Sequence, residues 1–160
     1  MAFHARHDAR RKVYRYRILQ APICPPFLGR FVYHCTRALD CSRMDRAAKL
    51  IEGTRDFTSF AAAGCRGHTA APRSCQDRSR IRTVFSSRVV WKPRTSTLVY
   101  EVHGNGFLHH MVRNIVGTLI EIGAAERDPT GISGLIEARD RSAAGATAPA
   151  RGLCLMRVEY

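Results

Sequence analysis

The strict alternation of residues 12–19 constrains this chain most, because it requires a strand whose two sides differ. The segment reads Lys-Val-Tyr-Arg-Tyr-Arg-Ile-Leu. One side carries Tyr14, Tyr16 and Ile18, and the other carries Arg15 and Arg17 together with Val13 and Leu19. Apolar and charged residues that alternate in this way predict a half-buried β-strand.

Other segments with clear periodicity predict a mixture of helices and strands. Asp40 is a suitable N-cap for a helix whose apolar residues recur at helical spacing as far as Ile51. Further predicted elements are strands over 81–91 and 97–103, a helix over 109–122, a short helix after Asp128 and a strand over 153–160. Because strands and helices do not alternate regularly, we expect an α+β fold with a largely antiparallel sheet, as one domain over residues 1–160.

The net charge of +13 comes almost entirely from arginine, since the lysines among the 26 cationic residues are only Lys12, Lys49 and Lys92. The planar guanidinium group binds phosphate oxygens and stacks on bases, which favours nucleic acid as the partner. The sequence contains no basic amphipathic helix and no apolar run long enough to span a membrane, so no membrane partner is expected. An arginine-rich genome is the alternative explanation of the charge.

Residue spacing alone identifies no catalytic or metal site. None of the six cysteines forms a Cys-x-x-Cys pair, so we expect free thiols in a reducing cytoplasm and no structural metal. His109 and His110 are adjacent and would project about 100° apart on a helix, which prevents both from binding one metal ion. The carboxylates are few and scattered. These patterns describe a basic domain that binds nucleic acid, and nothing more specific.

Five strings of residues, however, occur in an order typical of one family. They are Phe-His-Ala-Arg (3–6), Tyr-Arg-Tyr-Arg-Ile (14–18), Asp-Phe-Thr-Ser-Phe (56–60), Asn-Gly-Phe-Leu-His-His-Met-Val-Arg-Asn-Ile-Val-Gly (105–117) and Thr-Ala-Pro-Ala-Arg-Gly-Leu (147–153). In these strings the chain resembles the bacterial tRNA pseudouridine synthase A family. The resemblance covers nearly the whole chain apart from residues 64–77, which are expected to be an insertion loop. It implies the C-terminal portion of the pseudouridine synthase fold, with helices flanking the sheet.

The resemblance implies a cytoplasmic, homodimeric enzyme that isomerises uridine to pseudouridine in the anticodon arm of tRNA without any cofactor. The target nucleotide must leave its stack and enter a pocket. Members of the family begin with a further half-domain that carries Gly-Arg-Thr-Asp-Ala-Gly-Val-His-Ala, whose aspartate is catalytic. That string does not occur among the 160 residues, so we expect this chain to be inactive alone. A non-catalytic RNA-binding module and a fragment that does not fold are the alternatives.

The same resemblance assigns roles to individual residues. Tyr14 would pack on the face of the uracil and accept a proton during the rearrangement, and Leu153 would form an apolar wall of the pocket. The alternative for both residues is a place in the core of the sheet. For Arg82, contact with RNA and an ion pair in the core are equally supported. The residues expected along an RNA-facing cleft are His109, His110, Arg113 and Asn114.

Overall fold

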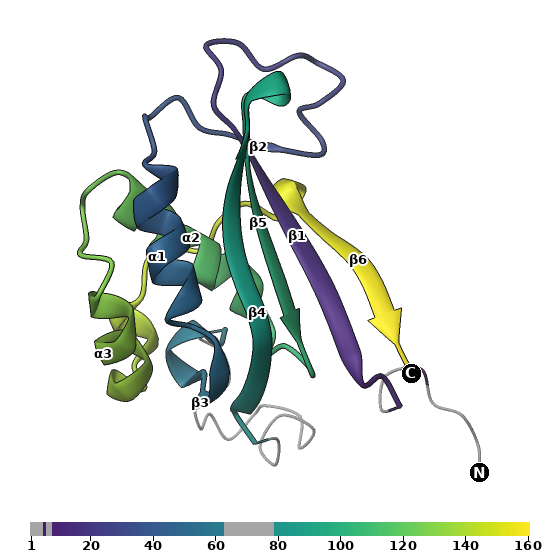
Figure 1. Cartoon of the computed structure of the whole chain (residues 1–160), viewed down its shortest axis with the longest axis vertical. Helices are drawn as coiled ribbons and strands as arrows, with labels where there is room; N and C mark the ends of the chain where they lie inside the picture. The colour runs from purple at the N-terminus through teal and green to yellow at the C-terminus, as the bar shows by residue number, and fades with distance from the viewer. Residues whose placement is uncertain (1–4, 6–7, 63–78) are drawn as a thin grey trace, which may run out of the picture.

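A six-stranded sheet with helices against one face makes up this protein, in a computed structural model that describes residues 5, 8–62 and 79–160 (Figure 1). The strands are β1 (Arg11–Leu19), β2 (Tyr33–His34), β3 (Gly53–Asp56), β4 (Ile81–Lys92), β5 (Thr97–Gly104) and β6 (Leu153–Glu159). Their order is β2-β1-β5-β4-β3, and β6 also pairs with β1. Among the described strands every pairing except β1–β2 is antiparallel, which confirms the expected fold class. The expected insertion at 64–77 lies outside the described residues.

Strand β1 has the two-sided character that its alternation predicted. Tyr16 and Ile18 face the helices with 0% and 1% of their surface exposed, opposite Tyr100 and Leu98 of β5. Strands β4, β5 and β6 also lie where the sequence placed them. The short strands β2 and β3 were not expected, because both are defined by pairing with distant residues. β2 pairs with the end of β1, and β3 pairs with the start of β4.

Helix α1 (Cys41–Lys49) confirms the cap predicted at Asp40. The Asp40 carboxylate accepts hydrogen bonds from the backbone N–H groups of Ser42 and Arg43, at 2.8 and 3.0 Å. These are two of the donors that the first turn of a helix leaves without internal partners. The predicted short helix after Asp128 is α3 (Gly131–Ala138). Figure 1 shows both helices on the same side of the sheet.

Helix α2 (Met111–Gly123) differs from the sequence-based expectation in one respect. The sequence placed Arg113 and Asn114 along an RNA-facing cleft, but every residue of the helix except Arg113 and Glu121 is buried. The outer side is covered by residues 144–148, whose backbone approaches the helix very closely. A Cβ atom on Gly117 would lie 1.6 Å from the carbonyl oxygen of Ala146. The helix is therefore an internal element of the fold.

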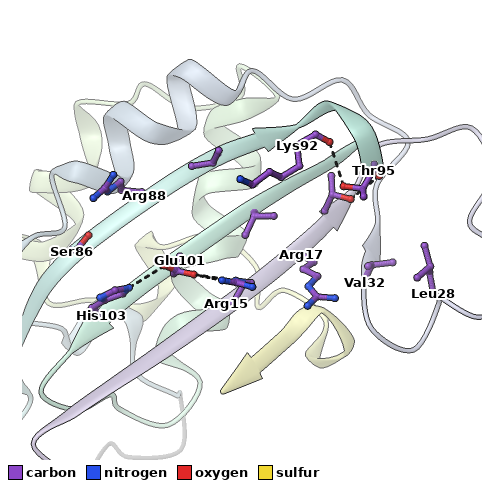
Figure 2. A pocket seen from close by; sticks show the side chains of 13 residues that line it. Arg15, Arg17, Leu28, Val32, Ser86, Arg88, Lys92, Thr95, Glu101 and His103 are labelled. Atoms are coloured by element: carbon purple, nitrogen blue, oxygen red, sulfur yellow. Dashed lines mark hydrogen bonds and ion pairs between the residues drawn. The ribbon is translucent and has the colours of Figure 1, made fainter. Parts of the chain in front are cut away.

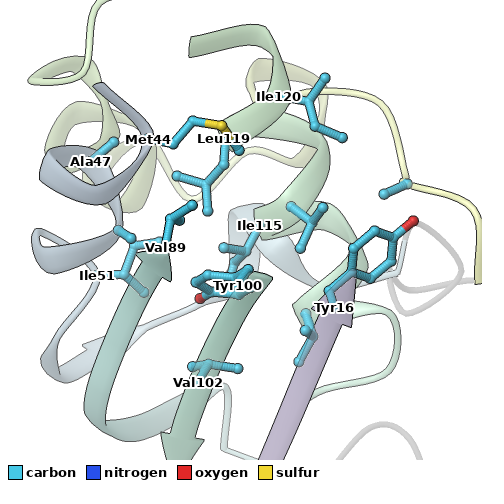
Figure 3. Packing of buried hydrophobic residues seen from close by; sticks show 14 of the residues in the cluster. Tyr16, Met44, Ala47, Ile51, Val89, Tyr100, Val102, Ile115, Leu119 and Ile120 are labelled. Atoms are coloured by element: carbon cyan, nitrogen blue, oxygen red, sulfur yellow. The ribbon is translucent and has the colours of Figure 1, made fainter. Parts of the chain in front are cut away.

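The core lies between the sheet and helices α1 and α2 (Figure 3). Tyr16 and Tyr100 of the sheet are its largest buried side chains, and Met44, Ile115 and Leu119 from the helices are also fully buried. The Tyr100 hydroxyl is 3.0 Å from the Ser87 hydroxyl, so its polar end has a partner inside the core. This packing fixes β1 and the segment before α2, which carry the residues of interest below.

Strand β6 forms an edge of the sheet beside β1. Among the described residues no strand pairs with its outer side. Leu155 and Met156 on this strand are 47% and 42% exposed. Unpaired backbone groups next to exposed apolar side chains can pair with another strand.

Two further features concern membranes and thiols. In the described part of the chain no helix is long and apolar enough to cross a membrane.

The described cysteines Cys24, Cys35, Cys41 and Cys154 are all free thiols. Cys65 and Cys75 lie outside the described residues.

Candidate active site

Tyr14 occupies the middle of β1, on the face of the sheet that carries the helices. It pairs with Val102 of β5 on one side and with Leu155 of β6 on the other. Directly opposed residues of antiparallel strands share a face, and Val102 is fully buried. A register shift between Val13 and Tyr14 interrupts the pairing with β6 at this point. Bulges of this kind redirect a side chain. Tyr14 is half-buried, so one part of the ring is open to solvent.

The Tyr14 ring is held by Phe107, which lies in the turn between β5 and α2. The two ring centroids are 5.2 Å apart and the planes meet at 88°, an edge-to-face arrangement. Burial raises the pKa of the Tyr14 hydroxyl above its ordinary value, so the group is protonated at neutral pH. Among the described residues this hydroxyl makes no hydrogen bond. The arrangement leaves a fixed aromatic surface with a neutral hydroxyl at its end.

Leu153 begins β6 and is also half-buried against the core. It pairs with Tyr16, which makes it a diagonal neighbour of Tyr14 at about 7–8 Å. The backbone before Leu153 is fixed by Tyr16, whose hydroxyl donates a 2.6 Å hydrogen bond to the carbonyl oxygen of Pro149. Gly152 lies directly on the same ring, because a Cβ atom there would be 2.7 Å from two of its carbons. Leu153 is thus placed by close packing against Tyr16.

Arg113 lies in the first turn of α2, near the same hydroxyl. Burial is the main cause that raises the pKa of Tyr16, and electrostatic interaction with Tyr33 adds to the rise. The nearby cations Arg113 and Arg151 oppose that shift. The Nε atom of Arg113 donates a 2.7 Å hydrogen bond to the carbonyl oxygen of Ala148. Arg113 therefore links α2 to the segment that leads to Leu153.

Asn114 is not at the surface where an RNA-facing residue was expected. Its side chain is fully buried, and its Nδ2 donates a 2.7 Å hydrogen bond to the carbonyl oxygen of Phe60. Its Oδ1 accepts hydrogen bonds from Thr147 at 2.7 Å and from Arg141 at 3.1 Å. The sequence suggested a solvent-facing side because residues 141–148 were not known to cover the helix. In this structure Asn114 joins three segments of the fold.

His109 and His110 stack on each other just before α2. Their ring centroids are 3.9 Å apart with a tilt of 32°. His109 is exposed, whereas His110 is partly buried and has a left-handed backbone with φ of 61°. Burial, with smaller contributions from His109, Arg113 and Arg141, lowers the pKa of His110. The neutral imidazole is therefore favoured at this position at neutral pH.

Arg82 lies on β4, against the turn that carries Phe107. A Cβ atom on Gly106 would be 3.7 Å from the Cδ and Nε atoms of Arg82. Its Nη1 donates hydrogen bonds of 2.6 Å to the carbonyl oxygens of Ser79 and Ile81. These bonds hold the guanidinium group beside Gly106, the residue before Phe107.

The structure brings most of the expected residues to one end of the sheet, around the start of α2. Tyr14 contacts Phe107 of the turn before α2, and Arg82 lies against Gly106 of the same turn. Leu153 pairs with Tyr16, and Arg113 lies near the Tyr16 hydroxyl. Two neighbours were not identified from the sequence. Phe107 follows the Asn-Gly turn and could have been noted as an aromatic residue between a strand and a helix. Arg151 lies in the string 147–153 that supports the family resemblance, but no role was assigned to it.

No metal site is evident within the described ranges, where no group of three or more His, Cys, Asp or Glu residues could hold an ion. The candidate site offers the phenol of Tyr14, and arginines lie near its neighbours: Arg82 lies beside Gly106, and Arg113 lies near the Tyr16 hydroxyl. This set favours an anionic, aromatic ligand, because the arginines match phosphate groups and Tyr14 offers a stacking surface.

Comparison with known proteins identifies relatives over nearly the whole chain. A family model described as tRNA pseudouridine synthase matches residues 47–160. Tyr14 lies before that match, but individual relatives extend further. A tRNA pseudouridine synthase A from Solibacter usitatus is 46% identical over 158 residues, which cover 99% of this chain and 59% of the relative. Its counterpart from Pseudomonas aeruginosa is 44% identical, over 99% of this chain and 51% of the relative.

A third relative of the same name, from Clostridium acetobutylicum, is 38% identical over the full chain and 61% of its own length. The chain therefore spans between about half and three fifths of the curated relatives it matches.

Proposed function

The chain belongs to the tRNA pseudouridine synthase family, and we propose that it forms one side of an active site that converts uridine to pseudouridine in the anticodon arm of tRNA. The observation that carries this proposal is the half-buried ring of Tyr14, held edge-to-face by Phe107, in the turn against which Arg82 lies. A fixed aromatic ring can stack on a uracil that has left the RNA helix. Leu153 would close the other side of the pocket with an apolar surface.

The isomerisation breaks the bond between ribose and the uracil nitrogen and forms a bond to carbon C5, which must then lose its proton. Tyr14 is protonated at neutral pH because burial raises its pKa. Its oxygen can accept the C5 proton only as its own proton passes to a neighbouring group or to water. We therefore assign Tyr14 two roles, stacking on the uracil and relaying this proton.

The nucleophile of the reaction would come from outside these 160 residues. Most of the described aspartates have structural partners near the surface of the fold. Asp40 caps α1, Asp45 pairs with Lys49 at 2.8 Å, and Asp56 and Asp128 each bond a threonine two residues later. The outer side of β6, next to Leu153, could pair with a strand of a further segment and bring a carboxylate to the pocket. Residues 1–160 would then be inactive alone.

Complementation tests this proposal. Tritium release from tRNA labelled at C5 of uridine would be measured with residues 1–160 and with the N-terminal segment of the Solibacter usitatus relative, separately and mixed. We expect release only from the mixture. Multiple turnover by residues 1–160 alone would contradict the need for an external carboxylate.

A non-catalytic RNA-binding module remains the second candidate, favoured by the net charge of +13. It predicts that the mixture binds tRNA without releasing tritium. We further propose that the complete enzyme is a cytoplasmic homodimer, as the family resemblance implies. Sedimentation of the complemented complex would measure its subunit number.

A further inference from the structure

The sheet face opposite the helices, called here the open face, contains a groove of about 630 Å³ (Figure 2). Strands β1, β4 and β5 form its floor, and the loop before β2 closes one end. Its cationic side chains are Arg15, Arg17, Arg88 and Lys92, and Glu101 is the only carboxylate among its described lining residues. None of these residues belongs to the candidate active site, because Arg15 and Arg17 alternate with Tyr14 and Tyr16 along β1. The function proposed above leaves this face unexplained.

The charges in the groove are unbalanced. Both oxygens of Glu101 are already occupied: Oε2 accepts hydrogen bonds from Arg15 at 2.7 and 3.1 Å, and Oε1 lies 3.1 Å from Nε2 of His103. The side chains of Arg17 and Lys92 have no acidic partner in the part of the chain that the structure describes. The charge of Arg88 helps to lower the pKa of Asp45, but Asp45 already forms an ion pair with Lys49. The groove therefore has an excess of positive charge.

The groove also continues toward the candidate active site. A second hollow of about 340 Å³ shares Arg17 with it and adds Arg30 and Arg151. Leu153 lines the same hollow, so a basic path leads from the open face, past the edge of β1, to the wall of the proposed pocket. A ligand that follows this path would be long, flexible and negatively charged.

We propose that the open face binds the sugar-phosphate backbone of an RNA strand, which continues around the edge of β1 from the candidate active site. Arg17 is the central contact because it lines both hollows, with Arg88 and Lys92 as further phosphate ligands. The charge balance disfavours a second copy of this chain as the occupant, since stacking two such faces would oppose like charges. The choice of RNA over other polyanions rests on the proposed function, but binding does not require activity.

The test measures binding of a short labelled oligouridylate to residues 1–160 by fluorescence anisotropy over a series of salt concentrations. The groove variant is Arg17→Gln/Arg88→Gln. The control, Arg46→Gln/Arg55→Gln, removes the same charge from exposed residues of α1 and β3. We expect the groove variant to bind about tenfold more weakly than the control, with a salt slope lower by roughly 0.7 for each phosphate that is no longer neutralised. Circular dichroism would verify that both variants fold.

A single substitution that removes a negative charge from the groove provides a second test of the proposal. Glu101→Gln removes the carboxylate of the groove and releases Arg15, so affinity should rise by roughly twofold to fivefold. Equal affinities of the groove variant and the control would overturn the proposal. So would a change from dimer to monomer on sedimentation with unchanged affinity, which would identify the face as an interface between copies. Loss of binding in the groove variant would support the proposal even if complementation yields no pseudouridine.

Discussion

Tyr14 and Arg15 are consecutive residues of β1, yet they belong to two regions with opposite physical character. On the helix-covered face the buried tyrosines have internal partners for their hydroxyl groups, Tyr16 with Pro149 and Tyr100 with Ser87, whereas the half-buried Tyr14 keeps its hydroxyl available. The open face combines apolar side chains such as Val90 and Val99 with four cations, and two of these, Arg17 and Lys92, lack acidic partners among the described residues. On the covered face close packing fixes the geometry, whereas on the open face electrostatic attraction provides the capacity to bind.

This difference predicts how each face responds to substitution. A change on the covered face should alter folding or chemistry by a large amount, because neighbouring atoms are in direct contact. A change on the open face should alter stability little, because solvent and salt screen the exposed charges.

The largest effect is expected from Gly117→Ala in α2. The new Cβ atom would lie 1.6 Å from the Ala146 carbonyl oxygen, so the backbone of residues 144–148 would have to move away. We expect the free energy of unfolding to fall by about 3 kcal/mol or more, measured by urea denaturation. Gly134→Ala is the matched control, because that helical position has no atom within 4 Å of the new Cβ and should gain up to about 1 kcal/mol. Similar stability of the two variants would contradict the close packing of α2.

A smaller but functionally important effect is expected from Tyr14→Phe in the complemented enzyme. The ring would still pack on Phe107, but the hydroxyl that relays the C5 proton would be absent. Tritium release should slow by roughly 100-fold, with little change in tRNA affinity. Tyr160→Phe, which removes a hydroxyl from an exposed ring, should leave the rate unchanged. A normal rate with Tyr14→Phe would reduce Tyr14 to a packing residue.

The smallest effect is expected on the open face, from Glu101→Gln. Hydrogen bonding from Arg15 is the main cause that holds the pKa of Glu101 below its ordinary value of 4.5. A lowered folded-state pKa contributes stability that is present above pH 4.5 and is lost as the pH falls through the lower folded value. The variant should lose no more than about 1 kcal/mol at neutral pH, because both side chains are about a third exposed.

In acid, Glu101→Gln should lose less stability than the unmodified chain as the pH falls below 4.5. Urea denaturation at a series of pH values measures this difference. Asp45 and Asp56 also have lowered pKa values, since their hydrogen bonds outweigh the effect of burial, so part of the acid sensitivity should remain. Identical pH dependence of variant and unmodified chain would show that the Arg15–Glu101 pair contributes no stability.

The sequence was sufficient where a local pattern determines the structure. The alternation around Tyr16 identified β1, and the cap at Asp40 identified α1, because both patterns depend on residues close in the chain. Strand β2 could not be found in this way, since Tyr33 and His34 form a strand only by pairing with Ile18 and Leu19.

The candidate site shows the same limit. The resemblance identified Tyr14 and Leu153 by motif, but their fixed orientation comes from Phe107 and from the contact of Gly152 with Tyr16, both made through folding. For Asn114 the sequence suggested a role that the folded structure does not support. Asn114 was expected along an RNA-facing cleft, but residues 141–148 cover it, and its amide group makes hydrogen bonds inside the fold.

The outer edge of β6, unpaired within residues 8–62 and 79–160, has a consequence for handling this chain. A strand whose outer side is unpaired among the described residues, with exposed Leu155 and Met156, can pair either with a further segment or with another copy of the chain. Occupancy of the edge therefore follows mass action. Dilute solutions should keep the chain monomeric and ready to accept a partner segment. Concentrated solutions should fill the same edge with homotypic contacts, so the order in which the two segments are mixed will determine the yield of the complex.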